Sequence, residues 1–264
     1  MRFSRKLLGI PYAVFLLLFV AAPLLVLFFY AFTNGEGRFT LANFTGFFTD
    51  PNTLGTLFYS LAIAFVTTFV CLLLSYPAAY ALATSGIKKK SAVMILFMVP
   101  MWINFSLRIT ALKEILDFFE GNLAMYPFLN SVIGMTYDFL PFMILPIYNT
   151  LEKMDRSLIE AAEDLGAGSV HAFLKVTFPL SLPGVVSGIS MVFLPAMTNY
   201  VVLDMLYNST YIMGSLIGSY FAAYNWHGGS MIALILLGLI CVFTLLTENA
   251  GDRDNGVARG GGIL

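Results

Sequence analysis

Residues 57–83 read LFYSLAIAFVTTFVCLLLSYPAAYALA, and this stretch decides the fold class. It lies within 51–87, which contains no Asp, Glu, Lys or Arg, and further charge-free runs follow at 91–107, 176–203 and 205–247. A helix needs about 20 apolar residues to cross the hydrocarbon core of a bilayer. Strands of a membrane barrel would instead show short segments that alternate apolar and polar residues. The sequence therefore predicts an all-α integral membrane protein, whose helices satisfy their own backbone hydrogen bonds in lipid.

The composition of the whole chain agrees with this class. Hydrophobic residues make up 59% of the 264 residues and charged residues only 11%, whereas soluble domains carry about 25% charged residues. The two cysteines, Cys71 and Cys241, lie inside apolar runs and are expected to be buried small hydrophobic residues. The spacing of cysteine and histidine does not match a metal site. We therefore expect no metal and no cofactor.

The apolar runs predict six membrane spans, at 7–32, 57–83, 91–111, 130–150, 183–206 and 231–247. The first run continues to about Phe32, which is too long for a signal-peptide core, so we expect an uncleaved first helix. The apolar segment 211–224 is short and contains glycine, and we expect an external or re-entrant helix there. Residues 1–250 are assigned to the transmembrane domain. The polar, Gly-rich tail 251–264 is expected to be disordered.

Lysine and arginine are distributed unevenly between the two sides of the predicted bundle. Of the 14 such residues, all except Arg38, Arg108 and Lys113 fall at the termini or in the loops 84–90 and 151–182. Short loops rich in Lys and Arg face the cytoplasm. With six spans, both termini and the 151–182 loop are therefore expected on the cytoplasmic side of the cell membrane.

The 151–182 loop contains a compact pair of predicted helices. Ser157 followed by Glu160 has the spacing of a capping box, so a helix should begin there. Gly166 stands where a helix commonly ends with a left-handed residue. Ser169 could cap a second short helix, which Pro179 would end.

The first of these loop helices has the character of a docking surface. Ala161 and Ala162 leave one face thin enough for another protein to approach closely, and Leu165 supplies an apolar anchor. A helix lying on the membrane surface would be rich in Lys and Arg, whereas this helix carries Glu160 and Glu163. The acidic composition favours contact with a partner protein over a membrane-surface role.

The same loop carries a family resemblance. Glu160-Ala161-Ala162, followed after three residues by Gly166 and after nine more by Val176-Thr177-Phe178-Pro179, resembles the EAA loop of bacterial ABC-importer permeases. The resemblance implies the type I ABC-importer permease architecture, in which this loop is a coupling helix seated in a groove of an ATPase subunit. The residues that it assigns to the contact are Glu160, Ala161, Ala162, Leu165, Gly166 and Pro179, with Glu160 and Gly166 central.

Three further stretches are similar to spermidine/putrescine permeases of that family: PMWINFSLRITALKEIL from Pro100, LPFMILPIYNTLEKMD from Leu140 and FLPAMTNYVVLD from Phe193. They imply a permease subunit of a polyamine importer. Its partners would be a homologous permease, two ATP-binding subunits and an external polyamine-binding protein. The sequence contains no Walker-type phosphate loop, so the chain itself is not expected to be an enzyme.

Two alternatives to polyamine import remain open. The first keeps the fold and changes the cargo, because permeases for iron, thiamine, sulfate or molybdate share the EAA loop. The second is an ion-coupled secondary carrier that works without an ATPase. Such carriers often contain inverted repeats, and the sequence shows none.

Carboxylates and aromatic rings are the side chains that would bind the ammonium groups of a polyamine. Asp138 and Asp204 lie within or near predicted spans, where acids usually face a cavity. Asp204 falls where spermidine/putrescine permeases also have an acid. The alternative roles are a solvated acid at the membrane interface or a partner for Arg108 or Lys113. The aromatic candidates for the substrate path, each near an asparagine, are Trp102, Tyr148 and Tyr200, for which anchoring at the interface is the alternative.

One pattern predicts close helix packing. Gly184 and Gly188 form a small-xxx-small motif, which lets two helix backbones approach each other. The sequence leaves open whether the contact is made within the chain or with a second permease subunit.

Overall fold

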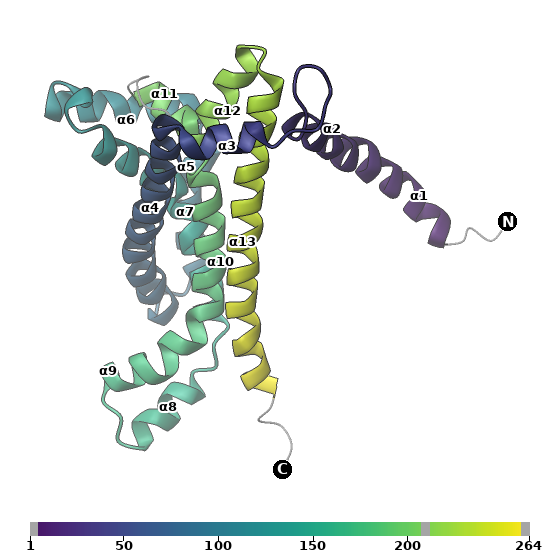
Figure 1. Cartoon of the computed structure of the whole chain (residues 1–264). Coiled ribbons are helices and arrows are strands. Elements are labelled where there is room, and N and C mark those ends of the chain that lie inside the picture. Colours follow the sequence, from purple (N-terminus) through teal and green to yellow (C-terminus); the bar gives the residue numbers. More distant parts are fainter. Residues whose placement is uncertain (1–4, 207–211, 260–264) are drawn as a thin grey trace. The chain divides into compact units, whose positions relative to one another are not determined.

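The computed structural model describes residues 5–206 and 212–259, with side chains for residues 10–206 and 212–247. These residues form helices joined by short loops (Figure 1), together with an isolated β-bridge between Thr33 and Phe39. The predicted all-α class is confirmed. The chain divides into two compact units, of which one comprises Met1–Phe58 with Met213–Cys241 and the other Tyr59–Ile212 with Val242–Leu264.

The first unit joins helices from distant parts of the sequence. These are α1 (Arg5–Leu16), α2 (Ala22–Ala31), α3 (Ala42–Thr49), α12 (Met213–Ala222), and parts of α4 (Pro51–Thr84) and α13 (Trp226–Arg259). The Asn43 side chain of α3 donates to the carbonyls of Ala31 (2.9 Å) and Thr33 (3.1 Å), which fixes the turn after α2. The Nδ1 atom of His227 in α13 lies 3.0 Å from the carbonyl oxygen of Tyr30, so α2 and α13 are in contact within this unit.

The second unit is organised around α7. Besides part of α4 it contains α5 (Lys90–Trp102), α6 (Phe105–Glu120), α7 (Pro127–Glu152), α8 (Ser157–Asp164), α9 (Ser169–Ala172), α10 (Phe178–Ala196) and α11 (Tyr200–Leu206). Met135, Met143 and Ile147 of α7 are fully buried. The hydroxyl of Ser75 in α4 donates to the carbonyl of Leu140 at 3.5 Å. Helix α7 is therefore the core element against which its neighbours pack.

The small-xxx-small motif lies at the contact between α10 and α7, which run side by side (Figure 1). A Cβ atom placed on Gly184 would lie 2.6 Å from Thr150 Oγ1 and 2.7 Å from the carbonyl oxygen of Pro146. A Cβ atom on Gly188 would lie 2.6 Å from Met143 Sδ. The contact that the sequence left open is thus made within the chain, and glycine is required because the two backbones touch there.

Substitution of Gly184 by alanine is expected to lower the free energy of unfolding by about 1–3 kcal/mol, because the added methyl group overpacks the α7–α10 contact. The clash involves a backbone carbonyl, which side-chain rotation cannot relieve. Unfolding in detergent micelles would measure the change. Gly238→Ala is the matched control, since no described atom lies within 4 Å of a Cβ built on Gly238. A Gly184→Ala chain as stable as the parent would contradict the expected overpacking.

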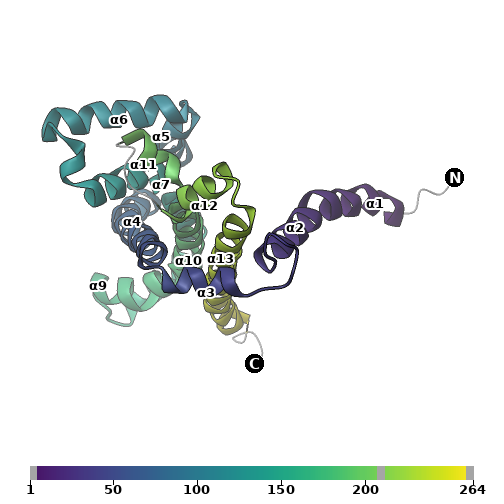
Figure 2. The same cartoon turned by 45° about the horizontal axis from the view of Figure 1, so that its top comes forward.

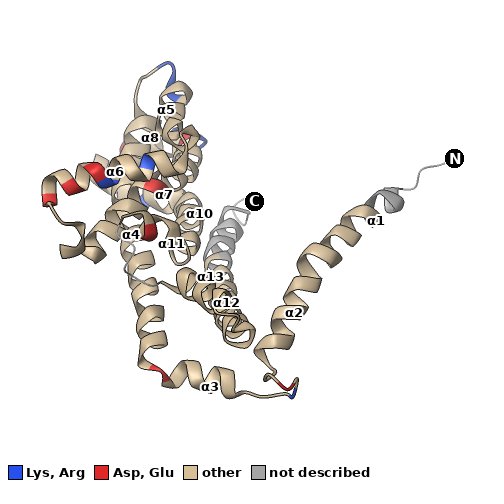
Figure 3. Cartoon of the chain, turned by 90° about the horizontal axis from the view of Figure 1, so that it is seen from above, with Lys and Arg blue, Asp and Glu red and all other residues tan. Residues whose placement is uncertain are grey.

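In the part of the chain that the structure describes, five helices are long and apolar enough to cross a membrane: Ile10–Ala31, Pro51–Thr84, Pro127–Glu152, Ser169–Ala196 and Trp226–Thr247. A sixth span is reached if α5 and α6 count as one bent span. Charged residues are unevenly distributed over the helices (Figure 3). Helices α4 and α10 are uncharged over most of their length, whereas charged residues gather on α6 and in loops. The prediction of several membrane-spanning helices is confirmed, and two of the predicted spans need correction.

The predicted third span, 91–111, is wrong as a continuous helix. Helices α5 and α6 meet at an angle of 90° after Trp102 (Figure 2). Ile103 is extended, and the Asn104 side chain accepts hydrogen bonds from the backbone N–H groups of Ser106 (3.0 Å) and Leu107 (3.3 Å). An asparagine cap of this kind begins a new helix. A hydropathy window detects apolar length and misses this local signal.

The predicted fifth span, 183–206, is also misplaced. The helical segment begins at Ser169 and ends at Ala196, and α11 is a separate short helix. The Thr198 hydroxyl donates to the carbonyl of Pro195 at 3.2 Å in the intervening turn. Threonine and asparagine side chains compete with helical hydrogen bonds in this way, which favours a turn at 197–199.

Two other segments bear on the expected topology. Within 211–224, α12 has 10 residues, which is about half the length that a span requires; residue 211 lies outside the described residues. Helix α13 continues to Arg259, so part of the segment 251–264, for which the sequence predicts disorder, is helical. Residues 260–264 lie outside the described residues.

Candidate functional sites

The loop between α7 and α10 forms a structured projection beyond the ends of those helices (Figure 1). Helix α8 begins at Ser157, as predicted, but the predicted capping box is wrong. Arg156 is the N-cap residue, and the carboxylate of Asp155 accepts a hydrogen bond from the backbone N–H of Ser157 at 3.0 Å. This bond lowers the pKa of Asp155 below its ordinary value. An aspartate just before the helix thus takes the part expected of the serine.

Helix α8 ends as the position of Gly166 predicts. Gly166 is left-handed, with φ +86°, and its N–H donates to the carbonyl of Glu163 at 2.9 Å. The N–H of Ala167 donates to the carbonyl of Ala162 at 3.0 Å. This pair of bonds is a Schellman motif, in which the left-handed residue is usually glycine because a Cβ atom would be strained there. The glycine fixes the turn at the tip of the loop.

Pro179 does not end the second loop helix. Helix α9 continues through the π-helical segment Phe173–Thr177 into α10, so that Ser169–Ala196 is one continuous helical stretch with Pro179 in the first turn of α10. The N–H of Phe178 donates to the carbonyl of Phe173, five residues earlier. The wider π-helical turn accommodates the proline, which lacks an N–H and would clash in a regular helix interior. The loop is therefore rigidly continuous with a membrane span.

The tip of the loop exposes an apolar surface. Leu165 is 90% exposed, and Leu158, Val170 and Leu174 are exposed as well. Ala162, Leu165 and Gly166 border a hollow of about 510 Å³ whose other lining residues are Ala167, Gly168 and His171. Glu160 and Ala161 are exposed on α8 outside the hollow, and Pro179, half-buried at the base of α10, does not line it. The structure thus gathers half of the predicted contact residues around one concave, unfilled surface.

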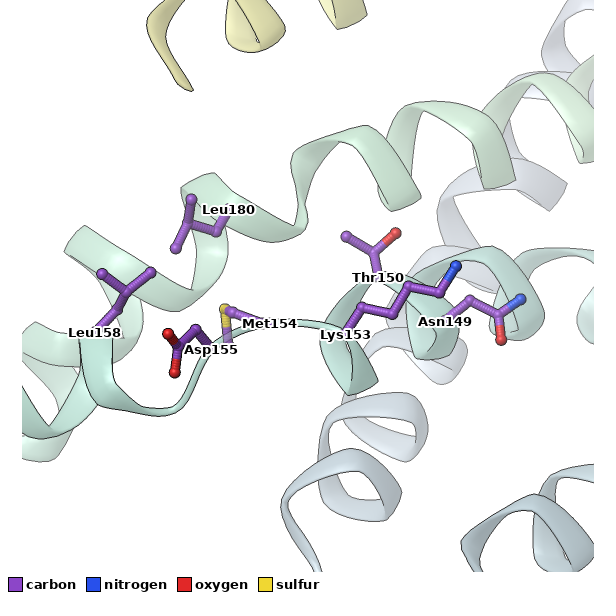
Figure 4. Close-up of a pocket in the computed structure, with 7 residues that line it drawn as sticks. All are labelled: Asn149, Thr150, Lys153, Met154, Asp155, Leu158 and Leu180. Atoms are coloured by element: carbon purple, nitrogen blue, oxygen red, sulfur yellow. The ribbon is translucent and has the colours of Figure 1, made fainter. Parts of the chain in front are cut away.

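A second hollow, of about 360 Å³, lies where α7 leads into α8 (Figure 4). Its lining residues are Asn149, Thr150, Lys153, Met154, Asp155, Leu158 and Leu180. In Figure 4 the Lys153 side chain lies along the end of α7, whereas the Asp155 carboxylate lies on the side of Leu158. The turn between α7 and α8 is therefore bordered by space on the side of α10.

A buried ion pair joins α6 to α7. Arg108 Nη2 donates to Asp138 Oδ1, and the two side chains are only 6% and 8% exposed. Arg108 Nη1 also donates to the carbonyl of Pro100 at 3.1 Å, and Asn199 Nδ2 donates to Asp138 Oδ2 at 3.4 Å. The Arg108 guanidinium lies 5.6 Å from the ring centroid of Tyr137. Asp138 therefore links the α5–α6 bend, α7 and the turn before α11.

The other predicted substrate-path residues are dispersed over this unit. Asp204 is exposed on α11 and Tyr200 begins that helix, while Trp102 is 76% exposed at the end of α5. Tyr148 is buried toward the other end of α7, where its hydroxyl donates to Glu152 Oε1 at 2.7 Å. Tyr200 directly follows Asn199, which is bonded to Asp138, whereas the partner of Tyr148 is Glu152. On sequence grounds, Arg108 was expected only as an alternative partner for an acidic residue. Two sequence features bear on its buried position: Pro100, whose carbonyl it binds, and Asn104, which caps the start of α6.

Comparison with known proteins gives consistent matches. Residues 75–249 match the family described as binding-protein-dependent transport system inner membrane component. The chain is 32% identical over 263 residues to the spermidine/putrescine transport system permease protein PotB of Haemophilus influenzae, with 91% of each chain covered. It is 35% identical over 212 residues to PotB of Escherichia coli, covering 72% of this chain and 76% of that one.

Solved structures with the same fold belong to a bacterial ABC transporter involved in the import of the acidic polysaccharide alginate. One of them matches with a TM-score of 0.74 and 12% identity, and 94% of each chain is covered. A second structure of a bacterial alginate transporter, in complex with a pentasaccharide-bound periplasmic protein, matches with a TM-score of 0.73 at 11% identity. At such low identity these likenesses concern the fold alone.

Proposed function

Because the chain belongs to the family of binding-protein-dependent transport system inner membrane components, we propose that it is the membrane-spanning permease subunit of an ATP-driven polyamine importer. The observation that carries the cargo class is the similarity to spermidine/putrescine permeases over 91% of both chains. Residues assigned from the sequence to the substrate path, Asp138, Asp204, Trp102, Tyr148 and Tyr200, remain part of this proposal.

Charge on the described helices supports a cationic cargo. Asp204 is exposed on α11, and Glu114 and Asp117 are exposed on α6. Arg108, in contrast, is buried and neutralised by Asp138, so its guanidinium is not free to bind an oxyanion. An amine would meet carboxylates as it approaches these helices, whereas sulfate or molybdate would meet repulsion.

The exposed surface of α8 is the proposed contact with an ATP-binding subunit. Its acidic residues would meet basic groups of the partner, while Leu165 would fill a pocket and the Gly166 turn would allow close approach. A homologous permease, a second ATP-binding subunit and an external polyamine-binding protein complete the proposed assembly. The excess of Lys and Arg in the termini and loops supports placing both termini and α8 in the cytoplasm.

The continuity of the loop with α10 supports a mechanical role. Closure of the ATP-binding subunits would displace α8 and α9, and the displacement would pass through Phe173–Thr177 into α10 without a flexible joint. Since α10 touches α7 through Gly184 and Gly188, both helices would move together. This motion would switch the bundle between inward-open and outward-open states, with ATP hydrolysis in the partner.

The proposal predicts that polyamines stimulate ATP hydrolysis by the assembled complex. The chain would be purified with its partner permease and ATP-binding subunits, reconstituted in proteoliposomes, and assayed with the external binding protein and spermidine or putrescine. We expect hydrolysis to rise severalfold over the rate without polyamine. Thiamine, ferric iron, sulfate and molybdate serve as controls. Stimulation by one of these solutes and not by polyamines would reassign the cargo.

A further inference from the structure

The end of α4 is bonded to residues outside its own helix. The last carbonyl groups of a helix lack helical partners. The buried carbonyl of Ala83 accepts a hydrogen bond from Arg156 Nη2 at 3.1 Å and another from Lys90 Nζ. Both donors are cations, which the negative end of a helix dipole favours. Arg156 is the N-cap residue of α8, so the residue at which the exposed loop helix begins is also bonded to a membrane span.

An aromatic cluster makes a second contact between the loop and α4. The Phe173 ring meets the ring of Tyr80 edge to face at 5.2 Å between centroids, and that of Tyr76 at 5.9 Å. The Tyr76 hydroxyl and Ser181 Oγ are 2.8 Å apart, which joins α4 to α10. Tyr76, Tyr80 and Ala83 are spaced i, i+4 and i+7, so they share one face of α4. That face contacts α8, the π-helical segment and α10.

The contact with α4 contrasts with the chain connection from α7. Helix α7 leads into α8 through a turn at Met154 and Asp155, and this turn borders the hollow drawn in Figure 4. On the side of α4, the same loop is held by hydrogen bonds and packed rings. Displacement is transmitted through packed and hydrogen-bonded contacts. The contacts of the loop with α4 are therefore expected to transmit a displacement of α8 more strongly than the turn from α7 does.

We propose that Arg156 is a positioning residue that couples displacement of α8 to α4, with the Phe173–Tyr80 contact as its second support. The inference rests on the proposed function, because it explains how displacement of α8 by an ATP-binding subunit would reach α4. Helix α4 is a span that does not adjoin α8 in the sequence. It assigns Arg156 to transmission within the chain, in distinction from the residues assigned to the ATP-binding partner.

The test compares Arg156→Gln with the parent chain in the complete complex in proteoliposomes. Polyamine uptake per ATP hydrolysed is expected to fall by roughly 5- to 10-fold, within the usual range of coupling between sites, while the ATP-binding subunit still co-purifies. Arg156→Lys should restore part of the coupling, because a cation can still donate to Ala83. Lys88→Gln removes another exposed cation, from the short loop after α4, and should leave the ratio unchanged.

Two results would overturn the inference. One is an unchanged uptake ratio in Arg156→Gln, and the other is loss of co-purification, which would place Arg156 in the partner contact. A further measurement does not depend on transport. Spin labels at Ala81 and Ser169, in a chain without its two cysteines, should show a broader distance distribution in Arg156→Gln than in the parent. Equal widths would contradict the link even if no polyamine transport were found, whereas a broadened distribution without transport would count only against the proposed function.

Discussion

Replacement of Asp138 by alanine is expected to lower the free energy of unfolding by about 3–5 kcal/mol, because it leaves a buried guanidinium without its counter-charge. Arg108 and Asp138 are almost completely buried, and the carboxylate is the acidic partner that the structure gives to Arg108. In a membrane span the unpaired charge cannot be solvated at its native position. Helix α6 would have to swing out, which would also break the bond from Arg108 to Pro100.

Unfolding of the purified chain in mixed micelles would measure this effect. Asp204→Ala is the matched control, since Asp204 is exposed on α11 and its removal should change stability by less than about 0.5 kcal/mol. A double variant, Arg108→Met with Asp138→Leu, should recover most of the loss, because an apolar pair of similar volume replaces the ion pair. A single Asp138→Ala chain of parental stability would show that the pair does not hold α6 to α7.

Substitution of Leu165 by alanine is expected to weaken association with the ATP-binding subunit by roughly 30-fold or more, equivalent to about 2 kcal/mol. The side chain is 90% exposed at the rim of the hollow at the loop tip, and the left-handed Gly166 next to it holds it outward. Complete burial of an exposed leucine side chain in a partner's pocket contributes about 1.5–3 kcal/mol through its apolar area. The fold of the free chain should be unaffected, since few of its own contacts are lost.

Titration of the permease complex with the ATP-binding subunit would give the dissociation constant for this comparison. Phe118→Ala is the matched control. Phe118 is 84% exposed on α6, in a different part of the unit, and the substitution removes a larger apolar side chain than Leu165→Ala does. If both variants weaken association equally, the loss reflects general exposure of apolar surface. If neither does, the ATP-binding subunit does not bind at the tip of this loop.

The sequence predicted local features of the loop more accurately than its connection to the membrane spans. The start of α8 and the Gly166 turn follow from residues within a few positions of each other, and both are found where expected. The end assigned at Pro179 failed, because the π-helical segment before it changes the hydrogen-bond register. That segment has no distinct composition, so the rule that proline ends a helix could not be corrected from sequence.

The substrate-path candidates show the complementary limit. Asp138 and Tyr148 were grouped by residue type, yet both lie on α7 with different partners, the buried Arg108 and the exposed Glu152. Their separation along the helix, about 15 Å at 1.5 Å per residue, could be calculated from the sequence. The identity of the partners could not, because it depends on which helices pack beside each end of α7.

The sequence by itself determined that this protein lies in a lipid bilayer, and it determined the position of the exposed loop. Charge-free runs long enough for a bilayer allow only helices, and a small polar island between two of them must project from the bundle. The tertiary structure decided the 90° bend after Trp102, the pairing of Arg108 with Asp138 and the bond from Arg156 to Ala83. These contacts join residues 30 and 73 positions apart. Helix packing brings such residues together, and packing in turn depends on close approaches such as those at Gly184 and Gly188, which no local pattern specifies in full.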